Sequence, residues 1–277
     1  MKARIKFQKY GSMKFVGHLD IMRYFQKVFR RANIDNEYSK GFSPHQIMSF
    51  AAPLGVGLTS DGEYLDVQLL SADSPEVMIE RINAALTEGF HIIGYRPLLE
   101  TEPNTKTVTA MALVASADYL VSLKDGYEIG ADINSKESFA EKFIKFMQSE
   151  EIVIGKKTKK SEMDVDIKPM ITLVAFEEED YEAKRRNTLE EHLKTEETSL
   201  SNKKPDSMAE VYENGIKIYL QLDTGSSSNL KPELVVEAFC ESLGVAYNQY
   251  AWQSHRIEVY TRNSETGKLA GLDQVDK

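Results

Sequence analysis

Alternation of polar and apolar residues predicts short strands near the N-terminus, with helical periodicity between them. Arg4–Phe7 alternates as a half-buried strand does, and so does Glu63–Leu70, where Tyr64, Asp66 and Gln68 oppose Leu65, Val67 and Leu69. From His18 to Ala32, apolar residues recur every three or four positions, which is typical of a helix with one buried face. The predicted buried stripe consists of Leu19, Met22, Phe25, Phe29 and Ala32.

Further elements complete a six-element order over residues 3–95. Ile47–Phe50 predicts a short strand, Ser74–Leu86 a helix with Pro75 in its first turn, and His91–Tyr95 a last strand. The order strand, helix, strand, strand, helix, strand is that of the ferredoxin-like split βαβ arrangement. Its two helices cover one face of an antiparallel sheet, so we expect the other face to be open to a ligand.

The second half of the chain repeats this plan. Asp118–Leu123, Ser135–Met147, Pro232–Leu243 and His255–Tyr260 are its clearest strand, helix, helix and strand. Four further segments predict strands: Glu151–Lys156, Met163–Ile167, Ile171–Phe176 and Gly215–Leu222. We therefore predict an α+β fold of two ferredoxin-like (split βαβ) subdomains with antiparallel sheets.

The predicted boundaries follow from these elements. A basic N-terminal domain takes residues 1–100, and a second domain takes residues 101–262. The polar stretch at 177–206 predicts a solvated helix or mobile insertion, and 263–277 predicts a flexible tail.

Charge is distributed unevenly along the chain. Residues 1–50 hold ten Lys or Arg and three acids, a formal charge of +7, whereas the whole chain is −9. Residues 51–277 therefore carry −16, and such a division allows one region to attract a polyanion. A single cysteine, Cys240, excludes an intrachain disulfide and a Cys-only metal site. We expect a cytoplasmic protein with no membrane association, and the sequence leaves its oligomeric state open.

The basic helix is the first candidate for nucleic-acid binding. Its cations fall largely on the side opposite the apolar stripe, where they suit contact with phosphates, although an ordinary solvated helix face has the same pattern. A second candidate is Ser39–His45, where Gly and Pro fix the backbone and Ser, Lys and His supply donors. This loop suits a phosphate or a general base, or it is a rigid crossover without a ligand. The basic run Lys156–Lys160 is a third candidate, or a solvated hairpin tip. The predicted nucleic-acid contacts are Lys6, Arg23, Lys27, Arg30, Arg31, Lys40, Phe42, Ser43, His45, Lys156, Lys157, Lys159 and Lys160.

Catalytic signals are weak. His18 and His45 are the candidates for an acid–base pair of the kind used in metal-independent RNA cleavage. No P-loop, GxSxG or HExxH motif occurs, and the Gly55-Val56-Gly57 run is a poor match to a dinucleotide fingerprint. We predict no metal and no cofactor, and a non-catalytic role is favoured.

Several stretches together resemble one bacterial family. They include Arg4–Phe7, Lys14–Asp20, Ser39–His45, Ser49–Gly55 and Ser60–Tyr64, and later stretches such as Lys156–Pro169 and Asn229–Pro232 are also similar. The chain resembles the radical SAM-linked proteins, also described as the DUF2344 domain of unknown function. That resemblance implies a radical SAM partner, whose chemistry would belong to the other polypeptide because this chain has no three-cysteine cluster motif.

The element order is also similar to that of the RAMP-type, Cas6-like RNA-binding proteins. The leading hypothesis is thus an RNA-binding accessory protein that works with a radical SAM enzyme in tRNA or rRNA modification or processing. The alternatives are an endonuclease that uses His18 and His45, and a non-catalytic adaptor for the radical SAM partner.

Overall fold

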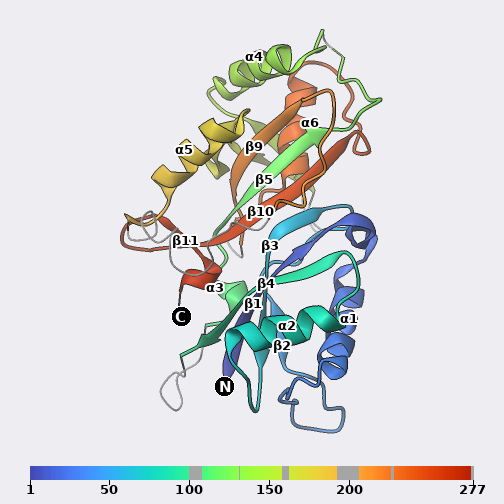
Figure 1. Ribbon diagram of the computed structural model, residues 1–277. Helices are drawn as coiled ribbons and strands as arrows, with labels where there is room; N and C mark the ends of the chain where they lie inside the picture. The colour runs from blue at the N-terminus through green and yellow to red at the C-terminus, as the bar shows by residue number, and fades with distance from the viewer. Residues whose placement is uncertain (100–107, 131, 158–161, 192–205, 226–227, 276–277) are drawn as a thin grey trace. The chain divides into compact units, whose positions relative to one another are not determined.

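The computed structural model describes residues 1–99, 108–130, 132–157, 162–191, 206–225 and 228–275 (Figure 1). The chain forms two compact units. The first consists of residues 1–115, 189–209 and 256–277, and the second of residues 116–188 and 210–255. Sequence patterns predict one division near residue 100, whereas the chain returns to the first unit twice. The mixed α+β composition is confirmed, with antiparallel strand pairing in both units.

The first unit contains a sheet in the order β4-β1-β3, and β3 also pairs with β2 and with β10. The β1–β3, β1–β4 and β2–β3 pairs are antiparallel. Its elements are β1 (Lys2–Lys9), η1 (Gly11–Phe15), α1 (His18–Arg31), β2 (Met48–Phe50), β3 (Thr59–Gln68), α2 (Pro75–Ala85), β4 (Phe90–Leu98), α3 (Ala110–Leu113), the later part of β10 (Trp252–Arg262), β11 (Leu269–Gly271) and η4 (Leu272–Gln274).

The side chains of β1 alternate between the two faces of the sheet in this unit. Ala3, Ile5 and Phe7 are buried in one apolar core with α1 and α2, because successive side chains of a strand point to opposite faces. The helices contribute Ile21, Phe25, Val28, Phe29, Met78 and Ile82 to this core. The sequence predicts Leu19 in the buried stripe, but Leu19 is 61% exposed, since Ile21 and Val28 take the inward positions of α1.

The opposite face of this sheet is polar, and the C-terminal segment covers part of it. Arg4 donates from Nη1 to the carbonyl oxygen of Leu272 at 2.7 Å, and Leu272 is fully buried. β11 pairs with β10 just before η4. Described residues of the segment that the sequence predicts as a flexible tail thus contact this face, which the sequence leaves open to a ligand.

The second unit has the strand order β10-β5-β9-β8, with a separate β6–β7 hairpin. Aromatic residues of α4 and α6, including Phe139, Phe143 and Phe239, pack against one another. Ser135 caps α4 as its sequence suggests, and its hydroxyl accepts from the backbone N–H of Ser138 at 3.2 Å. The elements are β5 (Ser116–Leu123), α4 (Lys136–Met147), β6 (Val153–Lys157), β7 (Glu162–Asp166), η2 (Lys168–Met170), β8 (Ile171–Ala175), α5 (Glu178–Thr188), β9 (Lys217–Asp223), α6 (Pro232–Ser242) and the start of β10.

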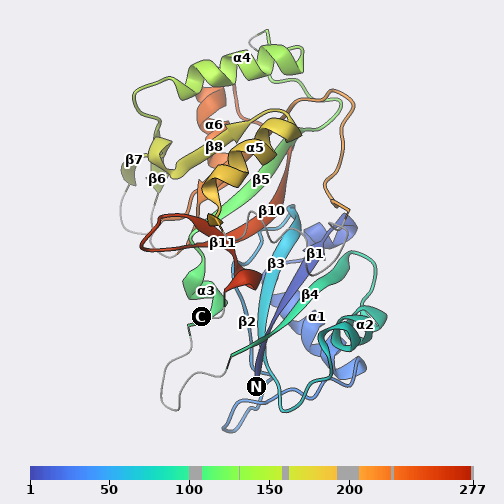
Figure 2. The same ribbon diagram turned by 60° about the vertical axis from the view of Figure 1, so that its left-hand side comes forward.

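Helix α5 occupies the first part of the predicted polar insertion, and it is anchored to this unit (Figure 2). Tyr181 is buried, donates to Asp118 of β5 at 2.7 Å, and stacks on Tyr219 of β9 with ring centroids 4.7 Å apart. The insertion therefore begins as a docked helix, and residues 192–205 lie outside the described residues. Among the described residues, no helix is long and apolar enough to cross a membrane.

Candidate functional site

A cationic ridge runs along the exposed side of α1. Leu19, Arg23, Lys27 and Arg30 are exposed and follow one another at spacings of four, four and three residues, so they share one side of the helix. Asp20 is the one acidic residue of α1, and its carboxylate lies 3.1 Å from Arg23 Nη1. An exposed pair of this kind is weak, so the ridge keeps an excess of positive charge.

Arg31 lies apart from this ridge. Its Nη2 donates to the carbonyl oxygen of Ala85 at 2.8 Å, and its guanidinium lies 5.9 Å from the ring centroid of Tyr24. The Tyr24 hydroxyl is in turn 2.9 Å from the Thr87 hydroxyl. Both side chains therefore tie α1 to the end of α2, and we leave Arg31 out of the candidate site.

Ser39–His45 forms an exposed loop that is closed at its base. The Ser39 N–H donates to the His45 carbonyl at 2.8 Å, and the Ser39 hydroxyl lies 2.9 Å from His45 Nδ1. Gly41 has a φ of 116°, which favours glycine. Phe42 is completely exposed, with 111% relative accessibility, and Lys40, Ser43 and His45 are exposed beside it. The loop thus presents an aromatic ring and a cation on a defined backbone.

The two candidate catalytic histidines are not brought together. His18 begins α1, and its ring centroid lies 5.2 Å from that of Phe50. Burial against this surface lowers the pKa of His18. His45 precedes Phe50 by five residues of mostly extended chain, roughly 16 Å at the strand rise per residue, and bonds to Ser39 instead. This separation gives no support to an acid–base pair.

Lys6 is engaged by carboxylates on the polar face of the sheet. Its Nζ lies 2.5 Å from Glu258 and 3.3 Å from Asp273. Burial alone lowers the pKa of Lys6, but these two carboxylates outweigh it and hold the pKa above its ordinary value. The charge of Lys6 is balanced there by two carboxylates, so we do not include Lys6 in the candidate site built on α1.

The basic run of the second unit is partly described. Lys156 and Lys157 end strand β6, opposite Met163 and Glu162 of β7. Lys159 and Lys160 lie outside the described residues. Lys156 and Lys157 belong to the second unit, so we do not include them in the site built on α1.

A buried charged cluster supports the backbone near the start of α1, and the sequence patterns did not single it out. Lys9 is 1% exposed, and its Nζ lies 3.5 Å and 3.4 Å from the carbonyl oxygens of Lys14 and Val16. Its pKa is lowered, chiefly because burial disfavours the ammonium. Glu63 and Arg256 form a buried ion pair, and Arg256 Nη2 also donates to the Ala52 carbonyl at 2.5 Å. The sequence offers one signal for the burial of Lys9. Its spacing of two residues from Phe7 and four from Ile5 places it on the buried face of β1.

Residues 2–232 match a family described as an uncharacterized protein conserved in bacteria (DUF2344). The chain belongs to the DUF2344 family. Comparison with curated proteins finds no match. The matched range contains the α1 ridge, the Ser39–His45 loop, Lys9 and Glu63, whereas Arg256, Glu258 and Asp273 of the DUF2344 protein lie beyond it.

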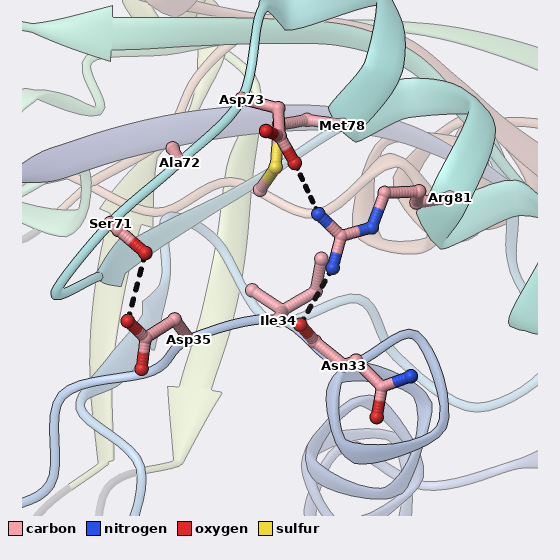
Figure 3. A pocket seen from close by; sticks show the side chains of 8 residues that line it. All are labelled: Asn33, Ile34, Asp35, Ser71, Ala72, Asp73, Met78 and Arg81. Carbon is pink, nitrogen blue, oxygen red and sulfur yellow. Dashed lines mark hydrogen bonds and ion pairs between the residues drawn. The ribbon is translucent and has the colours of Figure 1, made fainter.

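A polar pocket lies at the C-terminal end of α1 in the DUF2344 protein, lined by eight residues (Figure 3). Arg81 points at the last turn of α1 and donates to the carbonyl oxygens of Ala32 and Asn33 at 3.0 and 2.6 Å, and it also pairs with Asp73. Ser71 donates to Asp35 at 2.8 Å. The polar groups of the pocket thus bond to one another, and Arg81 caps the C-terminal end of α1. We therefore assign the pocket no ligand.

The metal-ligating side chains and the thiol of the described residues do not gather into one cluster. No group of three or more His, Cys, Asp or Glu side chains with metal-binding geometry occurs among the described residues. Cys240 of α6 is buried, and burial raises the pKa of its thiol to about 11. Such a thiol is a poor nucleophile and a poor metal ligand.

Proposed function

We propose that this DUF2344 protein binds RNA through the α1 ridge and the Ser39–His45 loop. The observation that carries this proposal is the alignment of Arg23, Lys27 and Arg30 on one exposed side of α1, with Asp20 as the only acid of that helix. Phosphates take such cations as their main contacts, and the release of bound counterions drives the association.

The charge of the remaining chain supports a defined orientation of the RNA. Residues 51–277 carry a formal charge of −16, which repels a polyanion from surfaces away from the first fifty residues. The RNA would thus be held at α1 while the acidic regions keep the protein soluble.

The strand orders support a ferredoxin-like interpretation of each unit. β4-β1-β3 with β2 beside β3, and β10-β5-β9-β8, both follow the fourth-first-third-second order of a split βαβ unit. We propose that both units are ferredoxin-like and that their likeness to RAMP-type RNA-binding proteins extends to function. The likeness is one of strand order and connection.

A radical SAM partner is proposed from the family resemblance. The modification chemistry, directed at tRNA or rRNA in the cytoplasm, would belong to that partner. The DUF2344 protein would hold the RNA. Its single cysteine is buried, so it does not supply the three-cysteine cluster motif that the partner would carry. RNA cleavage by this chain is the weaker alternative, because His18 and His45 are held apart by contacts to Phe50 and Ser39.

The proposal is tested by RNA binding with charge-matched variants. Filter binding of total tRNA and of an rRNA fragment is measured at low salt for the wild type and for a triple Arg23→Ala, Lys27→Ala, Arg30→Ala variant. The control loses three exposed lysines of the second unit: Lys136, Lys145 and Lys184. We expect the ridge variant to bind at least tenfold more weakly and the control to bind as the wild type does. Equal binding by the two variants, or no binding by the wild type, contradicts the proposal.

A further inference from the structure

We propose that the bound RNA is single-stranded and that Phe15 and Phe42 each stack on an unpaired base. This inference rests on the proposed function. It names the class of RNA, the role of Phe42 within the Ser39–His45 loop, and one further contact residue, Phe15. Phe15 ends η1, which precedes α1, and Phe42 lies in the loop that follows α1. The two rings therefore belong to the segments that flank the cationic ridge.

Phe15 is exposed although the backbone on both sides of it is fixed. Its accessibility is 67%, and Lys14 Nζ lies 5.5 Å from its ring centroid. The carbonyl oxygens that accept from the buried Lys9 ammonium belong to Lys14 and Val16, the two residues that flank Phe15. Gly57 N–H also donates to the Lys14 carbonyl, at 2.7 Å.

The cost of burying Lys9 points to a positioning role. A buried ammonium is unfavourable, and the pKa of Lys9 falls chiefly for that reason although the nearby Glu63 carboxylate raises it. Lys9 donates to the backbone beside an exposed aromatic residue, and η1 itself has no buried residue. Lys9 is therefore a positioning residue that holds Phe15 outward.

Phe42, in the loop that follows α1, is likewise an exposed ring on a fixed backbone. The bonds between Ser39 and His45 close its loop, so the exposed ring stands on a fixed base beside Lys40. The intervening helix has 14 residues, about 21 Å at 1.5 Å per residue. A strand that follows the cations of α1 would therefore meet an aromatic ring near each end.

Stacking selects the single-stranded form. Exposed aromatic rings bind base faces with little sequence preference, and a base pair inside a duplex has its faces covered by neighbouring pairs. Charge complementarity favours RNA over an apolar peptide, because three aligned cations of α1 lie between the two rings in the sequence. The experiment below distinguishes RNA from a protein ligand.

The experiment compares a fluorescein-labelled 12-nucleotide oligo(U) with a 12-base-pair RNA duplex. Affinities are measured by fluorescence anisotropy for the wild type, Phe15→Ala and Phe42→Ala. Tyr250→Ala is the matched control, because Tyr250 of the second unit is 68% exposed. We expect each Phe variant to bind oligo(U) about 5- to 150-fold more weakly, with no change in salt dependence. The Tyr250 control and duplex binding should stay unchanged.

Different failures have different meanings. If the wild type binds both RNAs and the Phe variants match the control, the stacking inference is overturned while the ridge keeps its RNA-binding role. If the wild type binds neither RNA at low salt, both proposals fail, and exposed Phe15 with Leu19 and Val56 would then suit a protein partner. Lys9→Met should weaken oligo(U) binding in the wild-type background but add nothing in Phe15→Ala. Additive losses would contradict the positioning role.

Discussion

Arg256 and Glu63, 193 residues apart in sequence, form a buried ion pair with two hydrogen bonds. Arg256 Nε donates to Glu63 Oε1 at 2.8 Å and Nη2 donates to Oε2 at 2.5 Å. The two side chains are 4% and 5% exposed. The pair joins β10 to β3 within the first unit, and Glu63 also raises the pKa of nearby Lys9 against the larger effect of burial.

Removing one partner of this pair should strongly destabilise the protein. Arg256→Met leaves the Glu63 carboxylate buried without its partner, so we expect a loss of about 3–5 kcal/mol in the free energy of unfolding. Urea titration followed by circular dichroism measures this loss. Lys184→Ala, which breaks the exposed Lys184–Asp180 pair, should cost less than about 1 kcal/mol. A similar small loss for both variants would show that the buried pair is dispensable.

Asp273 should make the anchoring of the C-terminal segment sensitive to acid. Burial opposes its ionisation, but Lys6 and the hydrogen bonds from Lys6 and Tyr64 hold the pKa of Asp273 below its ordinary value. A lowered pKa in the folded state contributes stability above the unfolded pKa of about 3.9, and this contribution is lost as the pH falls through the folded value. The protection of the β11 amides against hydrogen exchange, taken relative to their intrinsic exchange rate at each pH, should therefore fall in acid below about pH 4.

Asp273→Asn supplies the control for that titration. This variant should exchange faster than the wild type at pH 7, and the difference between the two should shrink as the pH falls through the lowered pKa of Asp273 and the wild-type carboxylate becomes protonated. Parallel pH profiles for the two proteins would rule out the Asp273 carboxylate as the group that titrates.

Tyr181 should anchor helix α5 through its hydroxyl. Tyr181→Phe keeps the ring stacked on Tyr219 but removes the donor to Asp118, whose Oδ2 also lies 3.6 Å from Arg185 Nε. Loss of a donor to a buried carboxylate costs about 1–3 kcal/mol. Hydrogen exchange within α5 should rise accordingly, and unchanged protection there would mean that ring packing alone holds the helix.

The thiol of Cys240 should be unreactive in the folded protein. Burial raises its pKa to about 11, so the thiolate fraction at pH 8 is small and reagent access is blocked. DTNB should label Cys240 only after urea unfolds the protein. Fast labelling of the native protein would contradict the burial of α6.

Local patterns predicted most elements because each pattern reports a face that is buried on folding. The His18–Ala32 periodicity corresponds to α1, and the alternation from Glu63 corresponds to β3. Pro75 and Pro232 lie at the starts of α2 and α6, where a missing N–H has no helical partner to lose. These features depend on neighbours within a few residues.

The rest of the site depends on contacts that one sequence does not reveal. The sequence alone suggests that Lys6 is a free cation, because its partner Asp273 lies 267 residues later in the chain. The same applies to Lys9, whose burial follows from the backbone of Lys14–Val16 folding over it. Phe15 looks like one more core residue by composition, and only its 67% exposure identifies it as a candidate contact.

The salt dependence of RNA binding tests the central claim most directly. The logarithm of the association constant is measured against the logarithm of salt concentration for the wild type and for the triple Arg23→Ala, Lys27→Ala, Arg30→Ala variant. Each lost phosphate contact to single-stranded RNA should reduce the slope by about 0.7, so the account predicts a slope shallower by about 2. An unchanged slope would show that these three cations of α1 do not contact phosphates, and would contradict the account.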